Sequence, residues 1–268
     1  MKLLFEKGIN SVKWMAVTLC VVSSGTAAAA IIHSDSFDSS PTLSSTQAAG
    51  AYYTDRYAPA TFDSEMFMGD NRLKLRLAAA DGAVNRPSSF SSAFYNTQGR
   101  KYDVAGATSA SIDMYIDSTF LSDPNRVGGL WGTAVDASNN ITAYPIIEFA
   151  NGVFQIWNGA SFDVVGLPTS FAADTFVNLA FELDTIADSF KYYLNNELVF
   201  TDTTADGSIS LSNLIIQGYN TTNGIDRTLY FDNLVASSTA VPAPGTLLLF
   251  FFSLVGVFVS SRRKLQAS

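Results

Sequence analysis

Strict alternation of apolar and polar residues in residues 176–184 constrains the fold of this chain more than any other feature. The apolar side chains occupy every second position and polar ones lie between them: Val177, Leu179, Phe181 and Leu183 against Asn178, Glu182 and Asp184. A period of two is that of a β-strand with one buried face. Turn residues follow at 187–188 and 195–196, so further strands are predicted at 190–194 and 198–200.

Comparable runs, separated by Gly, Asn, Asp, Ser and Pro, continue through residues 31–236. They predict strands at 72–77, 110–116, 144–149, 152–157, 214–218 and 228–235. The pattern supports no helix longer than two turns, and one short helix is expected at 58–66. Regular strands without helices predict a single all-β domain, a sandwich or a barrel. Arg56 or Arg72 is expected to pair with an aspartate near an edge of the sandwich, which would be a structural role.

The two ends of this domain carry motifs of a known architecture. Asp35-Ser36-Phe37-Asp38 opens it and residues 230–234, Tyr-Phe-Asp-Asn-Leu, close it. Both resemble the first and last strands of concanavalin A-like jelly rolls, and residues 177–200 resemble a strand pair of laminin-G-like domains. The resemblance implies a jelly-roll sandwich over residues 31–237 in which the first and last strands pair. A Greek-key barrel of another family is the alternative.

The first 30 residues have the order of a secretory signal peptide. Lys2, Lys7 and Lys13 precede an apolar stretch at 14–22, and small residues follow as far as Ala30. Ala28-Ala29-Ala30 fits the small-residue cleavage site that such peptides carry. We therefore expect signal peptidase to cut after Ala30 or, as second choice, after Ala28.

Residues 241–264 combine a proline pair, an apolar run and a basic cluster. Val241-Pro242-Ala243-Pro244-Gly245 comes first, an uncharged segment at 245–261 is predicted to form a transmembrane helix, and Arg262, Arg263 and Lys264 end it. This order resembles the PEP-CTERM sorting signal of Gram-negative bacteria, with Ala243 in the usual place of Glu. The resemblance implies an exosortase-type membrane protease as partner, a transient membrane stage and delivery to the cell surface or extracellular matrix. The alternative is an ordinary membrane anchor.

The amino-acid composition of the domain excludes some kinds of bond, metal site and binding partner. The only cysteine, Cys20, lies in the signal segment, so the domain has neither disulfides nor cysteine metal sites. Without the charged residues of the two end segments, 10 basic and 23 acidic residues remain, a net charge of 10 − 23 = −13. Such acidity excludes nucleic acid and anionic membrane surfaces as favoured partners.

Catalytic patterns are scarce. The only histidine, His33, is expected in a mobile mature terminus without a second metal ligand. Glu182 and Asp184 resemble part of the E-h-D-x-(x)-E strand of laminarinase-type glycoside hydrolases, but Ile186 or Ala187 stands in place of the last Glu. Hydrolysis through this cluster requires its carboxyl groups to converge in a cleft.

Aromatic residues supply candidates for sugar stacking. Trp131, Trp157 and Tyr144 lie near glycines in or beside predicted strand edges, where rings reach loops. Acidic turns at 117–123 and 202–207 offer oxygen atoms for calcium, although backbone turns explain the same residues. No cofactor is predicted.

These observations predict a non-enzymatic, exported surface or matrix protein that binds carbohydrate, with exopolysaccharide as its candidate ligand. A glycoside hydrolase or lyase on a jelly-roll fold is the first alternative. A purely structural matrix or adhesion protein is the second.

Overall fold

The computed structural model describes residues 29–90 and 93–238, without the side chains of residues 93 and 94. The predicted signal peptide up to Ala28, the proline motif, the apolar run and the basic cluster all lie outside the described residues. Ala30, the predicted cleavage position, is described and begins strand β1. Among the described residues no helix combines the length and hydropathy that a membrane crossing requires.

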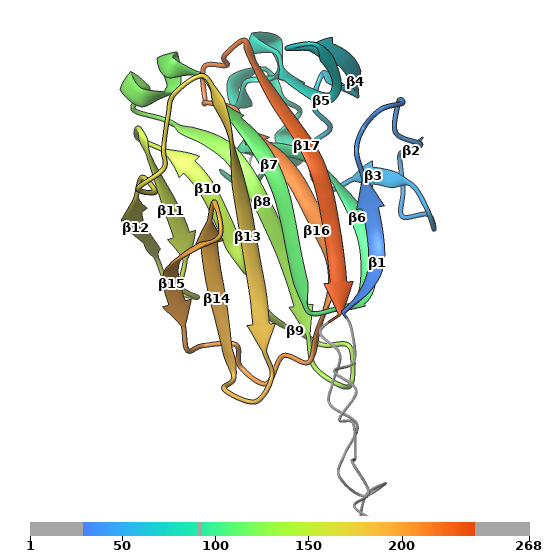
Figure 1. Cartoon of the computed structure of the whole chain (residues 1–268). Helices are drawn as coiled ribbons and strands as arrows, with labels where there is room; N and C mark the ends of the chain where they lie inside the picture. Colours follow the sequence, from blue (N-terminus) through green and yellow to red (C-terminus); the bar gives the residue numbers. More distant parts are fainter. Residues whose placement is uncertain (1–28, 91–92, 239–268) are drawn as a thin grey trace, which may run out of the picture. The chain divides into compact units, whose positions relative to one another are not determined.

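Two β-sheets build the described part of the chain (Figure 1). The first has the order β15 (Glu197–Asp202), β14 (Ser189–Leu194), β13 (Thr175–Asp184), β7 (Ser109–Ile116), β17 (Arg227–Ser238), β5 (Asp70–Leu77) and β4 (Thr61–Phe67), with β1 (Ala30–Asp35) beside β17. The second has the order β12 (Phe162–Gly166), β11 (Val153–Trp157), β10 (Ile146–Ala150), β8 (Arg126–Val135), β16 (Ser210–Tyr219), β6 (Thr97–Ala107), β3 (Tyr52–Thr54) and β2 (Leu43–Ser44), with β9 (Ile141–Ala143) beside β8. All neighbouring pairs are antiparallel except β2 and β3. The predicted all-β class is confirmed.

Short 3-10 helices occur only in the connections of the described chain. They are η1 (Ala79–Asp81), η2 (Ala83–Asn85), η3 (Ser88–Phe90), η4 (Ala93–Asn96) and η5 (Ser118–Ser122).

The core lies between the two sheets. On β13 the alternating residues predicted to face inward are almost completely buried, and the polar residues between them are partly exposed. Phe181 and Leu183 belong to the same buried cluster as Leu130 and Phe149 of the second sheet. The period-two pattern in the sequence therefore identifies the inward face correctly.

The predicted pairing of the first and last strands is confirmed. β1 runs antiparallel to β17, with Asp35 opposite Leu234 and Ala30 opposite Ser238. His33 belongs to β1, so its expected place in a mobile terminus is wrong: its ring stacks on Tyr102 with centroids 3.7 Å apart. Strand pairing and ring stacking hold it.

The expected helix at 58–66 is also wrong. Residues 61–67 form strand β4, which pairs along its whole length with β5. Phe62 is buried in the core while its neighbours in the strand are more exposed. Pairing with β5 and burial of Phe62 outweigh the local helical preference.

Candidate functional site: an aromatic groove on the outer face of the second sheet

A small apolar cluster lies apart from the main core, on the outer face of the second sheet. Trp131 of β8 pairs directly with Ile146 of β10 on one side and with Ile215 of β16 on the other. These three residues form their own buried cluster, and Trp157 and Phe162 pack against it. The sheet therefore presents apolar side chains on both of its faces.

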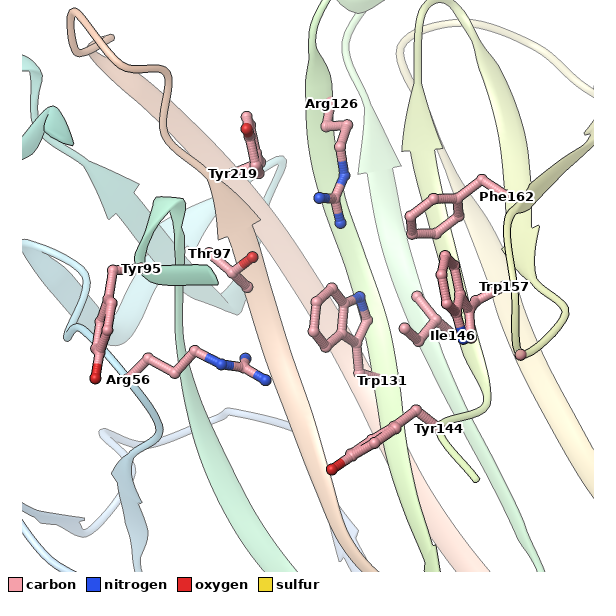
Figure 2. Close-up of a pocket in the computed structure, with 11 residues that line it drawn as sticks. Arg56, Tyr95, Thr97, Arg126, Trp131, Tyr144, Ile146, Trp157, Phe162 and Tyr219 are labelled. Carbon is pink, nitrogen blue, oxygen red and sulfur yellow. The ribbon is translucent and has the colours of Figure 1, made fainter. Parts of the chain in front are cut away.

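This cluster belongs to a groove with a cavity volume of about 850 Å³ (Figure 2). Its lining consists of aromatic side chains, two arginines and a few smaller residues: Arg56, Tyr95, Thr97, Arg126, Trp131, Tyr144, Ile146, Trp157, Gly159, Phe162 and Tyr219. Strands far apart in the sequence supply them, because β6, β16, β8, β10, β11 and β12 lie side by side in the sheet.

The structure brings together all three residues singled out for sugar stacking. Trp131, Trp157 and Tyr144 all line the groove, and Tyr144 is 42% exposed. The expected setting of Trp131 near a strand edge is wrong, because it lies in the middle of β8 and only 5% of it is exposed. Trp157 ends β11, and its ring meets that of Phe162 edge to face.

The indole nitrogen of Trp131 is the unusual atom of this groove. Trp131 Nε1 is buried and has no hydrogen-bond partner in the part of the chain that the structure describes. Buried donors are nearly always paired, and one without an acceptor costs about 1–3 kcal/mol. An acceptor oxygen of a bound molecule would satisfy this buried atom once a neighbouring groove side chain moved aside.

Beside Trp131, a buried ion pair crosses from β8 to β10. Arg126 donates from Nε and Nη2 to the two carboxylate oxygens of Glu148, at 2.6 and 2.7 Å. Gln155 Nε2 donates to Glu148 at 2.7 Å and Gln217 Nε2 at 3.4 Å. Glu148 is fully buried, so its oxygens are occupied by these donors and not by solvent.

Glycine makes room for this network. Gly129 of β8 lies opposite Glu148 on one side and Gln217 on the other. A β-carbon at residue 129 would lie 2.2 Å from the Ile147 carbonyl oxygen and 2.6 Å from Glu148 Cα. Any larger residue would have to push the neighbouring strand away.

Arginine side chains approach Trp131 from two sides (Figure 2). The guanidinium carbon of Arg126 lies 5.8 Å from the centre of the Trp131 ring, and that of Arg56 lies 5.4 Å from it. Arg126 also lies 5.0 Å from the Phe162 ring and 4.7 Å from the Tyr219 ring. These distances are within the range of cation–π attraction.

The predicted pairing of Arg56 and Arg72 with aspartates is present. Arg56 pairs with the buried Asp55 at 2.5 Å, and Arg72 pairs with Asp70 at 2.9 Å and with Asp232. The purely structural role expected for Arg56 is incomplete, however, because its side chain also lines the groove.

The carboxylates compared with a laminarinase motif lie elsewhere. Glu182 and Asp184 alternate with core residues of β13, so they face outward from the first sheet, on the opposite side of the sandwich from the groove. Backbone N–H groups led by that of Ala187, together with Lys191, hold the pKa of Asp184 below its ordinary value. Asp184 forms a surface turn and an ion pair with Lys191, whereas Glu182 accepts from the Tyr193 hydroxyl at 3.4 Å and lines a smaller pocket of about 340 Å³. Asp184 does not line that pocket, so the two carboxyl groups do not converge in one cleft.

The acidic turns considered for calcium make local bonds. Asp117 accepts hydrogen bonds from Thr119 at the start of η5, Asp123 pairs with Arg227, and Asp202 accepts from Thr204. Within residues 29–90 and 93–238, no three His, Cys, Asp or Glu side chains gather in a way that could hold a metal ion.

Sequence reasoning missed much of the polar part of the groove. Arg126, Glu148 and Gln217 come from three strands, and the turn residues used to find strands do not mark them. One signal was available: Glu148 interrupts the otherwise apolar run Ile146-Ile147-Glu148-Phe149-Ala150. A charge in a strand buried on both faces needs a partner on a neighbouring strand.

Comparison with known proteins shows which solved structures have a similar fold. No protein-family model and no curated protein matches the chain. Among solved structures, it is similar to the laminarinase catalytic domain from Thermotoga maritima, with a TM-score of 0.53 and 10% identity, over 80% of this chain and 99% of that one. It is also similar to the cellulose induced protein Cip1, with a TM-score of 0.50 and 12% identity, over 79% of this chain and 99% of that one.

A third similar structure is the endo-β-galactosidase from Clostridium perfringens that releases GlcNAcα1-4Gal. The TM-score is 0.51 and the identity 11%, over 79% of this chain and 62% of that one. The chain thus spans less than two thirds of that enzyme.

These similarities overturn one prediction and support another. The expectation of a non-enzymatic protein is wrong, because solved structures that share the fold include a laminarinase catalytic domain and an endo-β-galactosidase. They favour the alternative of a glycoside hydrolase or lyase. The described domain has the concanavalin A-like jelly-roll fold.

Proposed function

We propose that this protein is a carbohydrate-active enzyme, a glycoside hydrolase or lyase, whose substrate chain binds in the aromatic groove. The observation that carries the proposal is the buried, unpartnered indole N–H of Trp131 within a groove lined by aromatic rings. The jelly-roll fold, shared with glycoside hydrolases, supports it by analogy.

Trp131 supplies the polar contact. A sugar hydroxyl or ring oxygen is an acceptor of suitable size for a lone N–H donor. A saccharide whose binding moves a neighbouring side chain aside would satisfy Nε1 and remove the cost of the unpaired group.

Exposed rings supply the apolar contacts. Tyr144 and Trp157 lie beside Trp131 along the groove, and both are accessible enough to meet a ligand (Figure 2). The apolar face of a sugar ring packs well on such side chains, and the neighbouring polar groups fix its orientation.

If cleavage takes place in the groove, its catalytic carboxylates have to come from residues near the groove and not from β13. Glu148 and Asp55 are bonded to groove arginines, but their side chains are buried and ion-paired and neither lines the groove. Retaining hydrolysis needs two carboxyls about 5–5.5 Å apart, one of them able to give up a proton. Elimination needs a base and a cation near the reacting carbon instead. The products distinguish the two reactions.

The proposal includes export and sorting. We propose that signal peptidase removes residues 1–30 and that an exosortase-type protease acts at the Pro242–Pro244 motif, which would place the enzyme at the surface or in the matrix of a Gram-negative bacterium. The support is the order of charged, apolar and small residues in the two end segments.

Incubation of the full-length chain with a panel of polysaccharides tests the enzymatic proposal. Laminarin, lichenan, galactan and polygalacturonate are suitable, with new reducing ends measured for all and ultraviolet absorbance for unsaturated products. Hydrolysis gives reducing ends alone, whereas elimination gives both signals. If no polysaccharide of the panel is cleaved, the proposal is contradicted.

Two variants locate the activity. Trp131→Phe keeps an aromatic ring and removes the N–H, so binding should weaken about tenfold, the loss of one hydrogen bond to a buried donor. Glu182→Gln, on the outer face of the other sheet, should leave cleavage unchanged. Loss of cleavage in Glu182→Gln with full activity in Trp131→Phe would place the active site on the first sheet.

A further inference from the structure

The charge of the groove is opposite to that of the domain around it. Its lining contains two arginines, and among the described residues that line it there is no aspartate or glutamate. The whole chain carries a net charge of −8. Each guanidinium is bonded to a carboxylate that does not line the groove, so the charged side chains that face the cavity are both positive and can attract an anion.

The side chain of Arg126 is fixed in an orientation that suits the binding of such an anion. Its Nε and Nη2 are fixed by Glu148, which leaves Nη1 without an acceptor among the described residues. The side chain of Arg126 is 26% exposed, and it lines the groove. A guanidinium oriented by a buried carboxylate loses little freedom when it binds a further oxygen.

The other positive side chain lies on the far side of Trp131. Arg56 is fixed by Asp55, and Lys101 pairs with the same carboxylate at 2.8 Å. Two positive side chains therefore bond the same carboxylate at this corner of the groove.

We propose that the substrate is an acidic saccharide, whose carboxylate or sulfate group binds Arg126 while its sugar ring packs beside Trp131. This inference rests on the proposed function and specifies its substrate class. Trp131 Nε1 would donate to a hydroxyl of the sugar, and Arg56 provides long-range attraction to the anion. A neutral glucan would offer Nη1 of Arg126 only uncharged hydroxyl oxygens, which accept a weaker hydrogen bond than a carboxylate or sulfate does.

Pairs of saccharides that differ only in their acidic groups test whether the charge of the ligand increases its affinity. The binding affinity of the full-length chain is measured for polygalacturonate oligomers and their methyl esters, and for a sulfated galactan and its desulfated form. The acidic member of at least one pair should bind about tenfold or more tightly at low salt, and the difference should shrink in about 0.5 M salt. The pair that shows the preference identifies carboxylate or sulfate.

Variants at Arg126 assign the preference to this residue. Arg126→Lys keeps a positive charge beside Glu148 and loses the forked donor set, so the preference should fall below about threefold. In case this variant is unstable, the double variant Arg126→Met with Glu148→Met replaces the buried pair by apolar groups, a change that proteins often tolerate. Arg76→Gln, at an exposed ion pair on the first sheet, is the control and should keep the full preference.

The outcomes separate the two proposals. Equal binding of acidic and neutral members, or a full preference in Arg126→Lys or in the double variant, overturns the inference and leaves the proposed function standing. If no saccharide of either pair binds and no polysaccharide of the wider panel is cleaved, both fail.

Discussion

His33 is held by its neighbours on two sides. Its ring lies flat on Tyr102, and its Nε2 lies 3.3 Å from the hydroxyl of Tyr52, which donates to Asp35 at 3.0 Å. Burial lowers the pKa of His33 from its ordinary value of 6.5, and the nearby Asp35 opposes this only in part. Burial and the same aspartate raise the pKa of Tyr52. The folded state therefore favours neutral forms of both rings.

A dependence of stability on pH follows. The pKa of His33 is lower in the folded chain than in the unfolded chain. Its contribution to the free energy of unfolding is therefore complete above pH 6.5 and is lost as the pH falls through the lowered pKa. The free energy of unfolding, measured in urea at pH 7.5 and 5.5, should fall with acidification. His33→Phe, which keeps the ring on Tyr102, should show a smaller fall. An equal fall in both proteins would contradict this role.

The candidate site could be predicted from the sequence only for its aromatic residues. Trp131, Trp157 and Tyr144 are large rings near glycines, a local property that a single sequence displays. Arg126 and Glu148 are 22 positions apart and meet only because β8 and β10 pair in one register. Nothing local in the sequence specifies that register. Glu148 within an apolar run indicates that a buried charge has a partner, but not that the partner is Arg126.

At the scale of single elements, β8 shows why a search for alternating apolar and polar residues can miss a central strand. Almost every residue of β8 is buried, because its inward face meets the core and its outward face carries the groove. A strand covered on both sides shows no period of two. β13 has one exposed face and was predicted to within a residue.

Replacing Gly129 tests how tightly β8 is packed between its neighbours. Gly129→Ala places a β-carbon against the Ile147 carbonyl oxygen, so the free energy of unfolding should fall by about 2 kcal/mol. Urea denaturation measures it. Val164→Ala, at a 68% exposed position of β12 in the same sheet, should change stability by less than about 0.5 kcal/mol. A fully stable Gly129→Ala would show that β8 can shift.

At the scale of the whole molecule, the described chain begins and ends on one pair of strands. Ala30 and Ser238 are register partners in β1 and β17 (Figure 1). The resemblance of residues 35–38 and 230–234 to the end strands of jelly rolls predicted that the first and last strands pair, but β1 lies earlier than expected, at Ala30–Asp35, and contains only Asp35 of the opening motif. The topology of the strands between them could not be predicted, because β16 pairs with residues of β8 and β6 that lie 75 to 122 positions away, through contacts that no local pattern encodes.

The proposed processing is tested on the protein recovered from cells and from medium. Intact-mass analysis should find a species that begins near Ile31 and ends between Pro242 and Gly245. Both cuts would then lie within a few residues of the β1–β17 pair. Retention of residues 262–268 in the final protein would contradict sorting and indicate a simple membrane anchor.

The position of the tryptophans has a practical consequence. Of the three in the sequence, Trp131 and Trp157 both line the groove, and Trp14 lies outside the described residues. Tryptophan emission from the domain therefore comes only from the walls of the groove. A saccharide that enters should change its intensity or wavelength, so the protein carries an optical reporter of its own occupancy and titrations need no added label.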